Sequence, residues 1–194
     1  MAPAKRIYEV DLLGTAHVID AFLPVASAGT SMVCIASLAG HTMASTVAAD
    51  PDLETHLATA PTSQLLGHKA LSLDADNDYA GSGSAYGLAK RGNQLRVQAA
   101  AYAWGSKGAR INSVSPGIIA TSMGNQEMKG PGAERVKGLL GISAARRPGT
   151  PDDVANVVAF LVGNESAFVT GSDLFVDGGE WAGMRWQAGA ARGF

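Results

Sequence analysis

The sequence predicts an α/β fold in which helices cover both faces of a parallel sheet. Three short apolar segments, expected as strands, alternate with longer segments that have helical periodicity. Strands that alternate with helices are joined by crossover connections, which place the strands parallel to one another. The expected strands are residues 32–36, 109–115 and 172–176. Ligands in folds of this class bind at the carboxyl ends of the strands, so we expect the functional residues there.

The helices are predicted from the spacing of apolar residues and from capping signals. Apolar residues recur at a helical period over residues 7–25, and a long helical pattern covers residues 84–104. A shorter helix is expected near residues 133–140. Thr150 should begin a helix that continues through Leu161, because proline and two acidic residues follow it at the positive end of the helix dipole.

Residues 41–83 interrupt the alternation of strands and helices. The segment holds two prolines and clusters of Asp and Asn, with one possible helix over residues 52–71. It is too long for an ordinary connection, so we expect an insertion that acts as a lid or binding loop. No internal repeat or second-domain linker is visible, and residues 1–194 are expected to form a single domain.

Composition and charge limit the function classes. Lys and Arg number 15 against 17 Asp and Glu, with no basic run, which argues against nucleic acid or an anionic membrane as partner. No signal core or apolar run of membrane-spanning length is visible, so we expect a cytoplasmic protein. The single cysteine, Cys34, is expected as an inert core thiol. The four histidines lack ligand spacing, so no metal site is expected.

The residues most suggestive of chemistry lie at the start of the long helix. Tyr86 and Lys90 are four residues apart and therefore share one helix face. A cation beside a phenol favours the phenolate and lowers the pKa of the phenol toward neutrality, where acid–base catalysis on a carbonyl works best. Taken by itself the spacing is common, and a solvated helix on which the two side chains merely pack is the more frequent explanation.

Four segments, in order along the chain, resemble the short-chain dehydrogenase/reductase family. They are residues 35–40, Tyr86-x-x-x-Lys90, residues 110–121 and residues 176–179. The long excursion before the tyrosine looks most like the bacterial 3α-hydroxysteroid dehydrogenase/carbonyl reductase branch. The resemblance covers nearly the whole chain, and it implies the C-terminal part of a Rossmann-like, doubly wound parallel sheet.

The resemblance also implies a reaction, namely hydride transfer between NAD or NADP and a carbonyl or secondary alcohol. An alicyclic or steroid-like substrate is suggested by the same analogy. Tyr86 would exchange a proton with the substrate oxygen, and Lys90 would lower the pKa of that tyrosine and hydrogen-bond the nicotinamide ribose. Ser37 would hold and polarise the carbonyl.

Further cofactor contacts are implied after the second strand. The backbone following Pro116 and Gly117, near Ile119, would bind the nicotinamide carboxamide, and the hydroxyl of Thr121 would lie close to the cofactor. The family commonly pairs its last helix and last strand across a two-fold axis, so a homodimer with a small-molecule substrate is expected.

The sequence departs from the family pattern in two places. Asp11 stands where the family has a catalytic asparagine, and its charge could disturb a proton relay that starts at Lys90. The glycine-rich phosphate-binding turn would precede residue 1, and residues 81–87 do not supply a displaced copy. The strand at residues 32–36 should therefore have an open edge. A misassigned start or fragment, a half-domain covered by another subunit or by the insertion, and a degenerate relative all stay open as explanations.

Two other functions fit parts of the sequence. Ser37 with Tyr86 and Lys90 matches the Ser–Tyr–Lys logic of some esterases, which would make the protein a cofactor-independent hydrolase. No G-x-S-x-G elbow supports that interpretation. A non-catalytic binding module that uses the open edge and the insertion is the third hypothesis.

Overall fold

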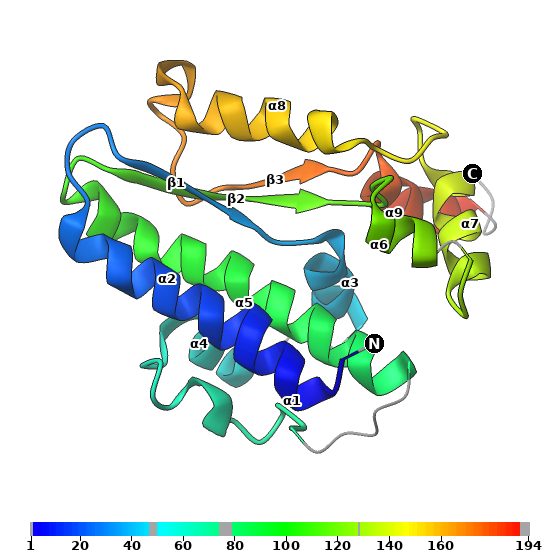
Figure 1. Ribbon diagram of the computed structural model, residues 1–194, viewed down its shortest axis with the longest axis horizontal. Coiled ribbons are helices and arrows are strands. Elements are labelled where there is room, and N and C mark those ends of the chain that lie inside the picture. Colours follow the sequence, from blue (N-terminus) through cyan, green and yellow to red (C-terminus); the bar gives the residue numbers. More distant parts are fainter. Residues whose placement is uncertain (1, 47–49, 74–78, 128, 191–194) are drawn as a thin grey trace.

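The structure, a computed structural model, describes residues 2–46, 50–73, 79–127 and 129–190 (Figure 1). It is an α/β fold around a three-stranded parallel sheet in the order β1-β2-β3. The strands are β1 (Ser31–Ile35), β2 (Arg110–Pro116) and β3 (Asp173–Val176). β2 pairs with β1 on one side and with β3 on the other. The predicted fold class and the three predicted strands are confirmed.

Helices cover both faces of this sheet (Figure 1). One face carries α5 (Tyr79–Gly105) together with a continuous rod made of α1 (Ala4–Ile7), η1 (Tyr8–Gly14), α2 (Thr15–Phe22) and η2 (Leu23–Val25). The opposite face is covered by α8 (Pro151–Val162). The central strand is consequently enclosed, and its residues 111–115 are all 0% exposed.

The rod at the beginning of the chain corresponds to the helix predicted over residues 7–25, with one local difference. Its η1 segment is a π-helix, which apolar periodicity alone does not reveal. π-Helical segments are rare and occur frequently at functional sites. Asp11 lies within this one.

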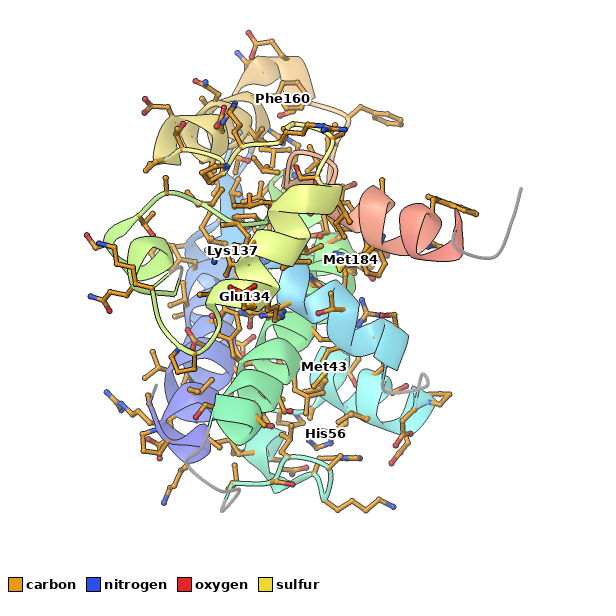
Figure 2. All side chains as sticks on the ribbon, turned by 90° about the vertical axis from the view of Figure 1, so that its right-hand side faces the viewer. Met43, His56, Glu134, Lys137, Phe160 and Met184 are labelled. Carbon is orange, nitrogen blue, oxygen red and sulfur yellow. The ribbon has the colours of Figure 1, made fainter. Side chains whose placement is uncertain are left out.

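The predicted insertion contains two helices, α3 (Leu38–Thr46) and α4 (Pro51–Thr59), and the short turn η3 (Leu65–Gly67). The single helix expected over residues 52–71 is therefore wrong, because α4 ends at Thr59. α5 begins at Tyr79, so the last residues assigned to the insertion belong to that helix. Met43 on α3 and His56 on α4 lie beside α5 (Figure 2).

The insertion contributes to the hydrophobic core where it is described. Leu53, Leu57 and Leu65 are at most 4% exposed and pack with Leu12 of the rod and Ala89 of α5. Burying such side chains contributes roughly 1.5–3 kcal/mol each. The described part of the insertion therefore packs as a layer against α5, while residues 47–49 and 74–78 lie outside the described residues.

The remaining described helices all follow β2. They are α6 (Ser122–Glu127), α7 (Ala133–Ile142), η4 (Asn164–Ser166) and α9 (Glu180–Ala190). The predicted helix near residues 133–140 is confirmed, and so is the predicted start of α8. Thr150 and Asp153 form a capping box there, each side chain accepting a backbone N–H from the other residue.

None of the described helices is both long and apolar enough to cross a bilayer.

Candidate active site at the carboxyl end of the sheet

α5 brings Tyr86 and Lys90 together. The Nζ atom of Lys90 lies 5.5 Å from the centroid of the Tyr86 ring, as the shared helix face requires. The same ammonium donates a hydrogen bond of 3.1 Å to the carbonyl of Ile35, the last residue of β1. Lys90 therefore lies between Tyr86 and the carboxyl end of β1. Ligands bind at the carboxyl ends of the strands in folds of this class.

Lys90 is a largely buried cation, since its side chain is 13% exposed. Burial lowers the pKa of Lys90, because a desolvated ammonium is disfavoured. Asp11 acts in the opposite direction, and its Oδ1 lies 4.0 Å from the Lys90 Nζ. Asp11, which the resemblance places where an asparagine is expected, thus faces the lysine, and its charge favours the ammonium.

The backbone of Asp11 is held independently of its carboxylate. Its carbonyl accepts hydrogen bonds from the Thr15 hydroxyl and from the side-chain amide of Asn93, both at 2.9 Å. Asn93 belongs to α5 and is 1% exposed. The π-helical segment is thereby fixed against the helix that carries Lys90.

Ser37 lies between β1 and α3, two residues beyond the carbonyl that Lys90 binds. Its Oγ accepts a hydrogen bond of 3.2 Å from the Ala39 backbone N–H, at the beginning of α3. Its carbonyl accepts from the Gln94 side-chain amide and from the Gly40 N–H, each at 3.0 Å. A hydroxyl that accepts in this way keeps its own hydrogen to donate to another group.

The segment after β2 is held by backbone hydrogen bonds on both sides. The Gly117 N–H donates to the carbonyl of Val176 at 3.1 Å, and Ile119 forms a parallel bridge with Gly149. Thr121 is exposed, and its Oγ1 accepts a bond of 3.1 Å from the Gly124 N–H. These contacts hold Gly117, Ile119 and Thr121, and Pro116 pairs with Val176 in the sheet. The resemblance assigns all four residues to the nicotinamide.

Glu180 is a residue of this region that sequence reasoning missed. It begins α9, is 1% exposed, and its Oε1 accepts a hydrogen bond of 3.1 Å from the Ile118 N–H. Its Oε2 is buried and has no hydrogen-bond partner among the described residues. A Cβ on Gly117 would lie 2.7 Å from that oxygen and 2.9 Å from the Asp177 Cβ, so a larger residue there would require these side chains to shift. The sequence signal would have been an acid directly after the Gly178-Gly179 turn.

Burial is the main cause that raises the pKa of Glu180 above its ordinary value of 4.5. The charge of Asp177 adds to this rise, while the Ile118 N–H and Arg135 oppose it. A carboxyl whose pKa is higher in the folded state stabilises the fold only while it is protonated. We therefore expect the free energy of unfolding to fall, relative to a Glu180→Gln variant, as the pH rises above about 4.5 and through the raised pKa.

Chemical denaturation of wild type and Glu180→Gln at a series of pH values checks this expectation. Glu134→Gln is the matched control, because the Glu134 side chain is 87% exposed on α7 (Figure 2). The control should follow the wild type across the pH range. A constant difference between Glu180→Gln and wild type at every pH would contradict the expectation.

Comparison with known proteins decides the family. The family model described as enoyl-(acyl carrier protein) reductase matches residues 69–180, which is more than half of the chain. The chain belongs to the short-chain dehydrogenase/reductase family. A short-chain dehydrogenase/reductase of Alternaria brassicicola, bsc3, is 41% identical over 178 residues, covering 92% of this chain and 63% of its own length. The predicted family is confirmed.

Other family members match shorter parts or the fold. A cyclopentanol dehydrogenase of Comamonas testosteroni is 37% identical over 116 residues, which cover 58% of this chain and 46% of that protein. The chain therefore spans less than two thirds of the length of these two curated relatives. The crystal structure of a 3α-hydroxysteroid dehydrogenase from Pseudomonas sp. B-0831 shares the fold, with a TM-score of 0.79 at 24% identity. That match covers 95% of this chain and 69% of the other.

The structure brings some predicted site residues into contact and leaves others apart. Tyr86, Lys90 and Asp11 form one group. Ser37 adjoins it, two residues beyond the Ile35 carbonyl that Lys90 binds at the end of β1. Gly117 and Ile118, directly after β2, lie against Glu180. Ile119 pairs with Gly149 and Thr121 with Gly124, apart from the first group. No three His, Cys, Asp or Glu side chains within the described ranges are arranged to hold a metal ion.

Proposed function

We propose that this short-chain dehydrogenase/reductase is an NAD- or NADP-dependent oxidoreductase that interconverts a carbonyl compound and a secondary alcohol. The observation that carries the proposal is the Lys90 ammonium beside the Tyr86 ring at the carboxyl end of β1. Relatives named cyclopentanol dehydrogenase and cyclohexanol dehydrogenase support the reaction class. The same relatives make an alicyclic alcohol or ketone the proposed substrate class.

We assign a role to each of four residues, and their contacts support these roles. Tyr86 exchanges a proton with the substrate oxygen through its phenol, and the positive charge of Lys90 stabilises the phenolate that forms. Ser37 donates its hydroxyl hydrogen to the same substrate oxygen, because its Oγ already accepts from the Ala39 N–H. Asp11 opposes the lowering of the Lys90 pKa by burial and so favours the ammonium form.

The residues present fit the nicotinamide end of the cofactor. Pro116 ends β2, and Gly117, Ile119 and Thr121 follow it directly at the carboxyl end of the strand. A side chain at position 117 would meet Glu180 and Asp177, so the glycine lets the backbone pass close to these residues. We assign the carboxamide to this segment and the ribose to Lys90. The bound cofactor supplies or accepts the hydride, which amino-acid side chains cannot do.

Two further parts of the proposal concern the assembly and the insertion. We propose a homodimer through α8 and β3, where Phe160 (Figure 2) and Phe175 are 41% and 39% exposed. We also propose that residues 1–194 form one domain, with residues 41–83 as an insertion beside the substrate. Sedimentation equilibrium of wild type and a Phe160→Ser variant tests the dimer; a wild-type monomer would contradict it.

The test of the function is a titration with NADH and with NADPH, followed by turnover with cyclohexanol, cyclohexanone and a 3α-hydroxysteroid. Saturable binding of one cofactor and cofactor-dependent turnover are expected. Hydrolysis of an aryl ester without any nicotinamide, abolished by Ser37→Ala, would instead favour a hydrolase. Neither the relatives nor a contact of Ser37 in the described structure favours that second function at present.

A further inference from the structure

We propose that Gln94 is a positioning residue for Ser37, and that a buried polar network through β2 and β3 holds both ends of the turn that carries this serine. The inference deepens the proposed oxidoreductase function and rests on it for its catalytic consequence. Its structural part stands on contacts that can be tested without turnover.

Gln94 continues the catalytic face of α5. It follows Lys90 by four residues and Tyr86 by eight, so the three side chains lie on one side of the helix. Gln94 is 0% exposed, and its Nε2 donates to the Ser37 carbonyl and to the Ser115 hydroxyl, both at 3.0 Å. Lys90 binds the carbonyl of Ile35 in the same manner. One face of α5 therefore binds two backbone carbonyls, those of Ile35 and Ser37.

The far end of the turn is held by a buried acid on β3. Asp173 accepts a hydrogen bond from the Ser113 hydroxyl at 2.5 Å and contacts His41 Nε2 at 2.7 Å. Its side chain is 5% exposed. His41 lies on α3, four residues beyond Ser37, and its ring centroid is 4.3 Å from that of Phe175. α3, which begins directly after Ser37, is thus bound through His41 to the edge strand β3.

The contact of Gln94 and the contact of His41 are connected through Ser115 of β2 and Asp173 of β3. Burial by itself would raise the pKa of Asp173, but hydrogen bonds from His41, Ser113 and Ser115 outweigh burial and lower the pKa below its ordinary value. Ser115 also accepts from Gln94, so it joins the acid to the amide. The Gln94 Nε2, the Ser115 hydroxyl and the Asp173 carboxylate are all bonded in this network, whereas the Gln94 Oε1 is buried and has no hydrogen-bond partner among the described residues. Removing a bonded member would leave its partner buried and unpaired, which is costly, so these bonds restrict the movement of the elements that they join.

Close packing of α3 on α5 agrees with this role. A Cβ on Gly40 would lie 2.8 Å from the Arg91 backbone nitrogen and 2.8 Å from the Gln94 amide. No larger residue fits between the two helices at this point. Gly40 itself donates its N–H to the Ser37 carbonyl, so that carbonyl has one partner from each helix.

Positioning matters here because the Ser37 hydroxyl must meet a substrate oxygen that Tyr86 also contacts. A misplacement of about 1 Å in such a group can lower the rate about a hundredfold. The backbone of Ser37 lies in a connection and not in a strand or helix, so its placement depends on these side-chain contacts. Gln94 is the contact that reaches Ser37 itself.

The experiment compares wild type with Gln94→Met, which keeps the side-chain length and removes both hydrogen bonds. Amide hydrogen exchange at Ala39 and Gly40 reports the Ser37 turn directly, since these N–H groups bind the Ser37 oxygens. We expect about tenfold faster exchange at both amides. We also expect kcat to fall about ten- to a hundredfold with little change in KM.

Gln98→Met is the matched control, because Gln98 is an exposed glutamine one turn further along α5. It should leave exchange and turnover unchanged. Ser115→Ala is the milder companion variant: it keeps the bond from Gln94 to Ser37 but removes the other anchor of the amide. A smaller change in the same direction is expected, and this variant decides the question if Gln94→Met does not fold.

Unchanged exchange at Ala39 and Gly40 in Gln94→Met, or in Ser115→Ala where only that variant folds, overturns the positioning role. Faster exchange with unchanged kcat overturns its catalytic part. If wild type itself shows no cofactor-dependent turnover, the proposed function fails, and the exchange result still decides whether Gln94 holds Ser37.

Discussion

Tyr86→Phe is expected to lower carbonyl reduction and alcohol oxidation by about a hundred- to ten-thousandfold, the range for removing a general acid or base. The substitution deletes only the phenolic oxygen, and the ring that Lys90 contacts at 5.5 Å from its centroid stays in place. The loss should therefore appear in kcat, with cofactor affinity little changed. Steady-state kinetics with cyclohexanol or cyclohexanone, together with cofactor titration, measure both quantities.

Tyr102→Phe is the matched control for this variant, because Tyr102 lies on the same helix and is 89% exposed. It should retain wild-type kcat and KM. Wild-type turnover in Tyr86→Phe would remove the tyrosine from the reaction and, with it, the proposed mechanism. Equal loss in both variants would point to a general effect on α5 instead of a catalytic one.

Local sequence patterns were sufficient for the features that depend on near neighbours. The four-residue spacing of Tyr86 and Lys90 predicts one shared helix face, and the structure shows that proximity. The cap at Thr150 is likewise predicted from the three residues that follow it. The short apolar strands were recognised because parallel strands covered on both faces need continuous apolar runs.

Contacts between distant residues could not be predicted in this way. Gln94 and Ser37 are 57 positions apart, Glu180 and Ile118 are 62 apart, and His41 and Asp173 are 132 apart. None of these contacts follows from a motif in the sequence, and each becomes informative only when the sheet places its neighbours. A glutamine within a helix is ordinary until the strand end that it binds is known.

The end of the helix predicted over residues 52–71 was wrong because it, too, depends on a contact with a distant residue. The helix expected over residues 52–71 ends at Thr59, where the Arg96 guanidinium of α5 donates to the carbonyls of Leu57 and Ala60. An arginine that is 7% exposed thus binds the carbonyl end of α4 from another helix. Apolar spacing within the insertion cannot reveal a partner that lies some 36 residues away.

Leu12→Ala is expected to lower the free energy of unfolding by about 2–5 kcal/mol, the range for truncating a fully buried leucine. Leu12 is 0% exposed and lies in the π-helical segment beside Asp11. Its Cδ1 occupies the space that a side chain at Gly92 of α5 would need. Gly92→Ala alone should therefore cost about 1–3 kcal/mol by overpacking. Denaturant unfolding of each variant measures these losses.

The two substitutions should compensate in part when they are combined, because the methyl group that Gly92→Ala introduces would fill space that Leu12→Ala vacates. We expect the double variant to be more stable than the sum of the single effects by about 0.5–3 kcal/mol. Val10→Ala, at a position 48% exposed on the same rod, should change stability by no more than about 0.5 kcal/mol. Strict additivity in the double variant would contradict the direct contact. That contact between the rod and α5 lies one residue from Asp11, whose Oδ1 is 4.0 Å from the Lys90 Nζ.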